Sequence, residues 1–200
     1  MTSEERREQR YQRRKAARLK KRQETIGKYD DFERVASLNS LYEAAREASK
    51  GVDWKASVQR YNSLLLFNIS KTRAELLAGK DIRRGFICFD ICERGKLRHI
   101  KSVHFSERVV QKSFCTNILY PTFTRSLIYD NGASQKGKGT QFALDRLTTH
   151  LRRHFRKYGR EGGILLIDFS DYFGNVAHEP LFEIYRQIFT DPRVIALGMR

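Results

Sequence analysis

Apolar residues recur at helical spacing in two segments of the N-terminal half, residues 31–48 and 54–77. An apolar stripe of this period is typical of an amphipathic helix that packs on a core. Gly51 and Gly79 follow the two segments as stop signals. We therefore expect two packing helices whose aromatic residues, including Trp54, lie in the core rather than stack on bases. Their stripes consist of Phe32, Val35, Leu38, Leu41 and Tyr42, and of Val58, Tyr61, Leu65, Ile69 and Leu76.

The next segments, 86–92 and 97–104, predict two strands joined by a tight turn at residues 93–96. Residues two apart on a strand share a face, so Lys96 and Arg98 should project side by side. Two cations beside a turn could bind the phosphates of a triphosphate. They also fit the simpler role of keeping an exposed hairpin soluble.

Two further helices are expected, a short one over residues 107–119 that Pro121 ends, and a longer one over residues 140–158 that Gly159 ends. The longer helix has an apolar stripe flanked by cations, so it can pack on a core and present positive charge outward. The stripe consists of Leu144, Leu147, Leu151, Phe155 and Tyr158, and the flanking cations are Arg146, Arg152, Arg153, Arg156 and Lys157.

A glycine-bounded apolar run, Gly163 to Phe169, predicts a buried strand with Asp168 near its end. A carboxylate that leaves a buried strand is costly unless it is paired or binds a cation. A turn should follow, then helices that begin near Glu179 and after Asp191.

Charge is the first indication of function. The chain carries a formal net charge of +16, most of it in two segments: residues 1–24 hold ten basic and four acidic residues, and residues 125–160 hold nine basic and two acidic residues. Such clustering is expected for a polyanion partner, with nucleic acid as the leading candidate. The first segment has almost no apolar stripe, which predicts a solvated basic helix or a disordered arm. No apolar run is long enough to span a membrane and no secretory signal is visible, so we expect a soluble, cytoplasmic protein with no membrane partner.

The three cysteines, Cys88, Cys92 and Cys115, do not suggest a disulfide framework. Cys88 and Cys92, with two histidines close behind, leave a zinc site open, although zinc ligands usually come from a tight knuckle or a helix rather than a strand. A phosphate-binding loop is a further alternative, because Gly132, Gly137 and Lys138 have its spacing. Residue 139 is glycine, however, where that loop needs a metal-binding hydroxyl.

Four segments in order resemble the N-terminal half of a reverse transcriptase, an RNA-directed DNA polymerase of the bacterial retron and group II intron type. Residues 94–98 resemble the first fingers motif, and residues 108–123 with the glycine-rich loop 131–140 resemble the second. Residues 168–178 are similar to the first palm motif, in which an aromatic residue follows the aspartate by five positions. The resemblance implies an α+β fold with a basic arm (1–30), a fingers-like region (31–160) and the beginning of a right-hand polymerase palm (161–200).

The same resemblance implies roles for individual residues. Asp168 and the backbone carbonyl of Phe169 would bind Mg²⁺, of which the complete enzyme uses two ions for nucleotidyl transfer. Lys96 and Arg98 would hold the dNTP phosphates, with Phe169 and Phe173 beside the nucleotide and Phe173 acting as a gate against a 2′-hydroxyl. The residues expected to contact an RNA template and its DNA primer are Arg108, Gln111, Lys136, Lys138, Arg146, Arg152 and Arg153. We assign Asp171 to the turn rather than to the metal.

The Tyr-x-Asp-Asp motif that supplies the other metal-binding carboxylates of this family is not among the 200 residues. We therefore expect a truncated or split polymerase that is inactive without a C-terminal half. The alternative is a non-catalytic RNA- or DNA-binding protein that retains the fingers and the template groove.

Overall fold

The computed structural model describes residues 2–170 and 172–200, with only the backbone of Phe173. The chain divides into two compact units: unit 1 comprises residues 1–122 and 184–200, and unit 2 comprises residues 123–183. Unit 1 combines helices with a two-stranded antiparallel sheet, so the α+β class is confirmed. No helix in the described part of the chain is long and apolar enough to cross a membrane.

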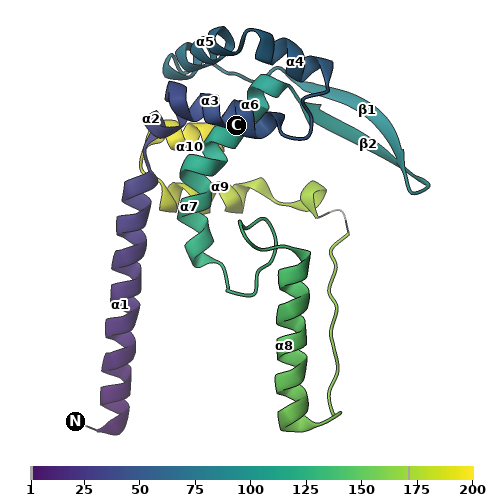
Figure 1. The fold of residues 1–200 in the computed structure, drawn as a ribbon. Helices are drawn as coiled ribbons and strands as arrows, with labels where there is room; N and C mark the ends of the chain where they lie inside the picture. Colours follow the sequence, from purple (N-terminus) through teal and green to yellow (C-terminus); the bar gives the residue numbers. More distant parts are fainter. Residues whose placement is uncertain (1, 171) are drawn as a thin grey trace. The chain divides into compact units, whose positions relative to one another are not determined.

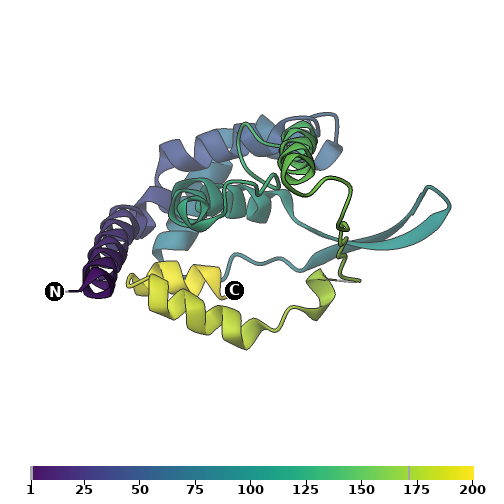
Figure 2. The same ribbon diagram turned by 90° about the horizontal axis from the view of Figure 1, so that it is seen from below.

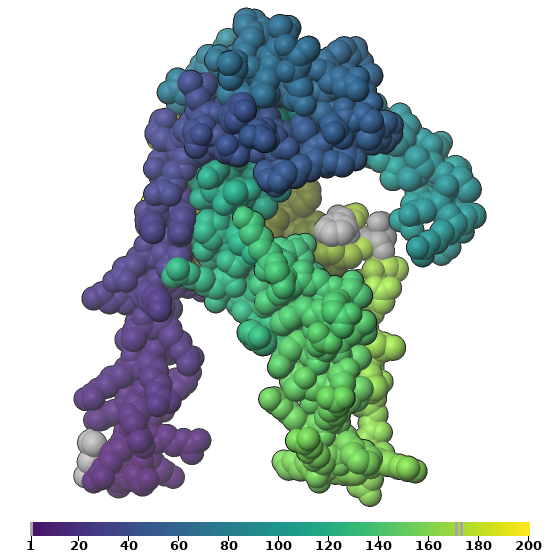
Figure 3. Space-filling view, viewed as in Figure 1, coloured from purple at the N-terminus to yellow at the C-terminus, as the bar shows by residue number. Residues whose placement is uncertain are grey.

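The basic N-terminal segment is a helix, α1 (Ser3–Tyr29), which is one of the two conformations expected for it. Thr2 and Glu5 form a reciprocal capping box, in which the Glu5 amide donates to Thr2 Oγ1 at 3.2 Å and the Thr2 amide donates to Glu5 Oε2 at 2.7 Å. Thr25 is the one buried residue of the helix. The side chains of α1 therefore stand in open space along most of its length (Figure 3).

The first predicted packing helix is interrupted and forms α2 (Phe32–Ala36) and α3 (Leu38–Ser49). Ser37 has an extended backbone, and its Oγ accepts a hydrogen bond from the Ser40 amide at 3.1 Å. A serine in this role starts a new helix, because it satisfies an amide that has no partner within the helix.

The second predicted packing helix also divides, into α4 (Ala56–Ser63) and α5 (Leu65–Leu77). The break falls at Leu64, whose backbone dihedrals are not helical. Tyr61 is buried as expected, but the prediction for Trp54 is wrong. Its side chain is 72% exposed beside Lys55, because it precedes α4 in a turn and does not belong to the apolar stripe.

The short third helix does not end at Pro121. It begins as α6 (Phe105–Phe114), widens into a π-helical turn over Cys115–Leu119 and continues as α7 (Tyr120–Phe123). Pro121 has no amide hydrogen for the α-helical ladder, and the wider turn lies immediately before it.

The core of unit 1 forms where α3 packs against α5 and α6. Ser113 Oγ of α6 is buried and donates to the Val35 carbonyl of α2 at 2.9 Å, which links these two helices. All buried apolar residues in the described part of the chain belong to this unit. They are Phe32, Val35, Ala36, Leu41, Ala44, Ala45, Val58, Tyr61, Ile69, Leu76, Val109, Val110, Phe114, Ile118, Phe189 and Val194.

The C-terminal helices begin close to the predicted positions, as α9 (His178–Ile188) and α10 (Pro192–Gly198). Asp191 caps α10, with Pro192 in its first turn. Asp30 Oδ2 accepts hydrogen bonds from Thr190 Oγ1 at 2.7 Å and from the Asp191 amide at 3.2 Å. The end of α1 is thereby joined to a segment 160 residues later.

The sheet consists of β1 (Phe86–Glu93) and β2 (Lys96–Val103), within one residue of the predicted strands. Arg94 and Gly95 form the turn, both with positive φ (52° and 77°). This is the conformation that a two-residue hairpin loop requires, because it matches the twist of the strands. The hairpin projects away from the helices of unit 1 (Figures 1 and 2).

Unit 2 contains short 3-10 turns at Thr124–Ser126 and Phe173–Asn175 and one long helix, α8 (Thr140–Tyr158). The predicted bounds of α8 are confirmed, and Gly159 ends it with φ 65°. The segment after Gly159 returns beside α8, where His154 Nε2 lies 2.6 Å from the Glu161 carbonyl oxygen (Figure 1). Unlike unit 1, unit 2 has no buried residue among those whose side chains the structure describes.

The buried strand predicted for Gly163 to Phe169 is absent. The segment has no strand pairing, and its apolar side chains are 65–90% exposed. A strand needs a neighbour for its backbone hydrogen bonds and a layer that covers its side chains. Among the described residues of unit 2 there is no strand that could supply such a neighbour.

Candidate nucleic-acid interface

The hairpin places two of the predicted nucleotide-binding residues on one face. Lys96 lies opposite Glu93 and Arg98 lies opposite Ile91, and opposed residues of an antiparallel pair share a face. Arg98 Nε is 3.2 Å from Glu93 Oε2, and both side chains are more than half exposed. An ion pair this exposed contributes little to stability, so the guanidinium can exchange Glu93 for another anion.

The other face of the hairpin carries Cys88, Asp90 and Cys92 with His99 opposite Asp90. Asp90 and His99 are hydrogen-bonded to one another. Cys88 and Cys92 are four residues apart on an extended strand, roughly 13 Å, so they cannot both bind one zinc ion in this conformation.

Arg108 and Gln111 lie on the exposed side of α6, three residues apart and therefore on neighbouring positions of the helix surface. The opposite side of α6 contributes Val109, Val110 and Phe114 to the core. These two predicted template contacts thus share unit 1 with Lys96 and Arg98, on a helix that the core holds rigidly.

In unit 2, the start of the glycine-rich loop is tied to α8 by a carboxylate that the sequence did not single out. Asp130 pairs with Arg146 through Oδ1, and its Oδ2 is 2.6 Å from His150 Nε2. Hydrogen bonds from Arg146 and His150 hold the pKa of the Asp130 carboxyl below its usual value. The four-residue spacing of Arg146 and His150 on one helix face is the signal that could have identified this cluster.

Lys138 forms a second tie between the same loop and α8. Its Nζ donates to the Tyr129 carbonyl at 2.6 Å and lies 4.9 Å from the ring centroids of Tyr129 and Phe142. Cation–π contacts of this kind stabilise the conformation of the loop. Lys138 and Arg146 are two of the cations expected to contact template in unit 2. Both therefore also hold the loop against α8.

The remaining cations of α8 are directed to solvent. Arg152 and Arg153 are exposed, as is Arg156, and none of the three forms an ion pair within the described residues. At about 100° of rotation per residue, Arg152 flanks the apolar stripe, as the sequence predicts, whereas Arg153 and Arg156 lie on the opposite side of α8. Lys136 is exposed in the loop.

Asp168 and Phe169 lie together in the extended segment after α8, both exposed. The Phe169 ring is 6.1 Å from the ring of Tyr172. Asp171 and the side chain of Phe173 fall outside the described residues. In the described part of the chain no cluster of three or more histidine, cysteine, aspartate or glutamate side chains is placed to hold a metal ion.

The structure thus brings the predicted residues together in two sets. Unit 1 holds the hairpin cations with Arg108 and Gln111, whereas unit 2 holds the loop, the α8 cations and Asp168. Comparison with protein-family models and with curated proteins finds no match to the chain.

Proposed function

We propose that this chain binds nucleic acid as the fingers and initial palm region of an RNA-directed DNA polymerase of the reverse transcriptase type. The observation that carries the proposal is the cationic side of α8, where Arg152, Arg153 and Arg156 are exposed and have no acidic partner in the described residues. Arginine side chains held in this way are suited to phosphate, since each guanidinium offers a planar fork of donors.

The roles of the remaining residues follow from the ordered resemblance to reverse transcriptases. Lys96 and Arg98 would hold the phosphates of a dNTP on one face of the hairpin. Arg108 and Gln111 would contact the template from α6. Because these side chains are exposed, a large polyanionic partner can reach all of them.

Mg²⁺ fits the described residues only in part. Asp168 offers one exposed carboxylate and Phe169 one carbonyl, whereas the two ions that such polymerases use to activate a 3′-oxygen and stabilise the leaving pyrophosphate need further oxygen ligands. We therefore assign Asp168 a metal-binding role within the proposal and derive no catalytic step from it.

The salt dependence of binding to a template–primer duplex tests the α8 interface. In the Arg152→Gln, Arg153→Gln and Arg156→Gln triple variant, the log–log salt slope should become shallower by about 2 to 3, because each lost phosphate contact removes roughly 0.9. A matched control replaces three exposed cations of unit 1, Lys55, Arg60 and Lys71, with glutamine. An equal change in both variants would contradict a template-binding role for α8.

Nucleotide binding separates the polymerase from a non-catalytic nucleic-acid-binding protein. Equilibrium dialysis with dNTP and Mg²⁺ should show weaker binding in Lys96→Gln and Arg98→Gln, and a loss of Mg²⁺ dependence in Asp168→Asn, with template affinity unchanged in all three. If the intact chain binds template but no dNTP, the non-catalytic function is favoured.

A further inference from the structure

Helix α1 converts a basic segment into an ordered row of arginines. Every fourth residue from position 6 to position 22 is arginine, and each of these side chains is exposed. Four residues of an α-helix rise about 6 Å, so the row extends over about 24 Å. Net charge alone does not indicate this arrangement. The members of the row, which we call the arginine row, are Arg6, Arg10, Arg14, Arg18 and Arg22.

The arginine row follows one ridge of the helix surface, because residues four apart are offset by about 40° around the axis. Its three central members therefore lie within about 80° of one another, whereas the two ends differ by about 160°. Two of the acidic residues near the start of the row are engaged in other hydrogen bonds. Glu5 belongs to the capping box, and Glu8 accepts a hydrogen bond from Gln12 at 2.6 Å. No member of the row forms an ion pair in the part of the chain that the structure describes.

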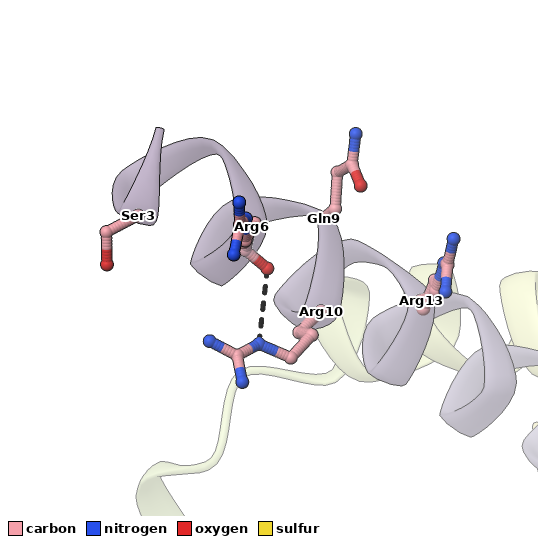
Figure 4. Close-up of a pocket in the computed structure, with 5 residues that line it drawn as sticks. All are labelled: Ser3, Arg6, Gln9, Arg10 and Arg13. Carbon is pink, nitrogen blue, oxygen red and sulfur yellow. Dashed lines mark hydrogen bonds between the residues drawn. The ribbon is translucent and has the colours of Figure 1, made fainter. Parts of the chain in front are cut away.

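Successive members of the row line shared shallow recesses. Arg6, Arg10 and Arg13 surround the first with Ser3 and Gln9 (Figure 4). Arg10 Nε donates to the Arg6 carbonyl at 3.2 Å, which holds the Arg10 guanidinium along the helix.

A second recess, one turn further along α1, is lined by three members of the row, Arg10, Arg14 and Arg18, together with Arg7 and Lys15. Neighbouring guanidinium groups therefore border a common hollow in which an oxyanion can accept hydrogen bonds from both.

We propose that the arginine row binds successive phosphates of a nucleic-acid backbone, as a site separate from the α8 interface. The absence of an apolar face on α1 favours phosphodiester over a lipid surface. Helices that lie in a membrane interface need an apolar face, and the exposed large apolar residues of α1 are limited to Tyr11 and Leu19. A regular row of identical cations matches the repeating phosphates of a backbone, so its binding should be largely independent of sequence.

The test compares two variants with the same loss of charge. One replaces the three central members of the arginine row, Arg10, Arg14 and Arg18, with glutamine. The matched control replaces three exposed lysines of α1 that lie outside both recesses with glutamine. Glutamine is a good helix former, so circular dichroism should show that α1 is retained in both. The control positions are Lys20, Lys21 and Lys28.

Binding is measured by fluorescence anisotropy between 50 and 300 mM salt, with single-stranded RNA, an RNA duplex and a DNA duplex of one sequence as separate probes. If all three arginines contact phosphate, the row variant should lose about 2.7 from the log–log slope on duplex DNA and about 2.1 on a single strand. The control should lose less than half as much. The probe with the largest difference identifies the backbone that the row prefers.

Equal losses in the two variants would overturn the inference, since diffuse charge would then explain binding. An unchanged slope in the row variant would also overturn it. Vesicles that contain phosphatidylserine serve as the competing surface, and row-dependent binding to vesicles but not to nucleic acid would assign the row to membranes instead. These outcomes are independent of the α8 triple variant, so either proposal can fail while the other stands.

Discussion

Units 1 and 2 contain amphipathic helices of similar sequence pattern, yet only in unit 1 are most residues of the apolar stripes buried, Leu38 at 49% exposure being an exception. Leu41 of α3 is completely buried, whereas Leu147 of α8, in an equally periodic stripe, is 46% exposed. The helices of unit 1 pack against one another. Unit 2 has one long helix and an unpaired extended segment. The comparison shows that a hydrophobic stripe predicts a helix, but burial depends on a second apolar surface of matching shape.

The largest expected difference between the units comes from the same substitution in each. Leu41→Ala should lower the free energy of unfolding by about 2 to 5 kcal/mol, because it removes buried contacts and leaves a cavity. Leu147→Ala is the control and should cost less than about 1 kcal/mol, as expected for an exposed site. Urea unfolding followed by circular dichroism measures both. Similar losses in the two variants would contradict the difference in packing.

A smaller effect is expected where Asp30 joins the end of α1 to the segment before α10. Asp30→Ala removes the acceptor for Thr190 and for the Asp191 amide, and unsatisfied donors of this kind cost about 1 to 3 kcal/mol. Asp53, an exposed aspartate of the same unit, provides the control as Asp53→Ala. Unfolding of unit 1 at a lower urea concentration in the first variant alone would support this link, and equal midpoints would refute it.

The next comparison concerns the helix starts of the two units. Ser37 caps α3, but Gly139 at the start of α8 offers no side-chain cap. Ser37→Ala should cost about 1 kcal/mol, whereas Gly139→Ser should stabilise α8 by a few tenths of a kcal/mol. A Cβ at position 139 meets no atom within 4 Å, so the added side chain has room. Thermal unfolding measures whether Ser37→Ala lowers stability and Gly139→Ser raises it. A loss of stability in Gly139→Ser would show that the loop needs glycine at this position.

The smallest effect concerns pH. Partial burial acts to raise the pKa of Asp191, but hydrogen bonds from Arg193 and from the Phe32 amide outweigh it, and the pKa lies below its usual value of 3.8. A lowered carboxyl pKa stabilises the folded state above pH 3.8, and this contribution is lost as the pH falls through the folded-state pKa. Asp191→Asn should therefore flatten the decline in stability of unit 1 below about pH 4. If the decline in stability below about pH 4 is the same in the variant, Asp191 does not contribute to the acid sensitivity of unit 1.

Particular elements show how far the sequence alone could lead. The β-hairpin and α8 were predictable because their signals are local: a two-residue turn with Gly95 at its second position, and an apolar stripe that ends at Gly159. The divisions at Ser37 and Leu64 were missed because the apolar period continues across both breaks. The roles of Asp130 and Lys138 within unit 2 were missed because each depends on a loop that folds back on α8.

The sequence by itself determined the helical periods, the position of the hairpin turn, the glycine that ends α8 and the segregation of cations along α1 and α8, since these depend on neighbours a few residues apart. Tertiary structure alone decided which stripes are buried, that Trp54 is exposed, and that residues 163–169 are extended rather than a buried strand. Burial and strand pairing need partners from distant parts of the chain, and their free energy is gained only when a complementary surface is in place.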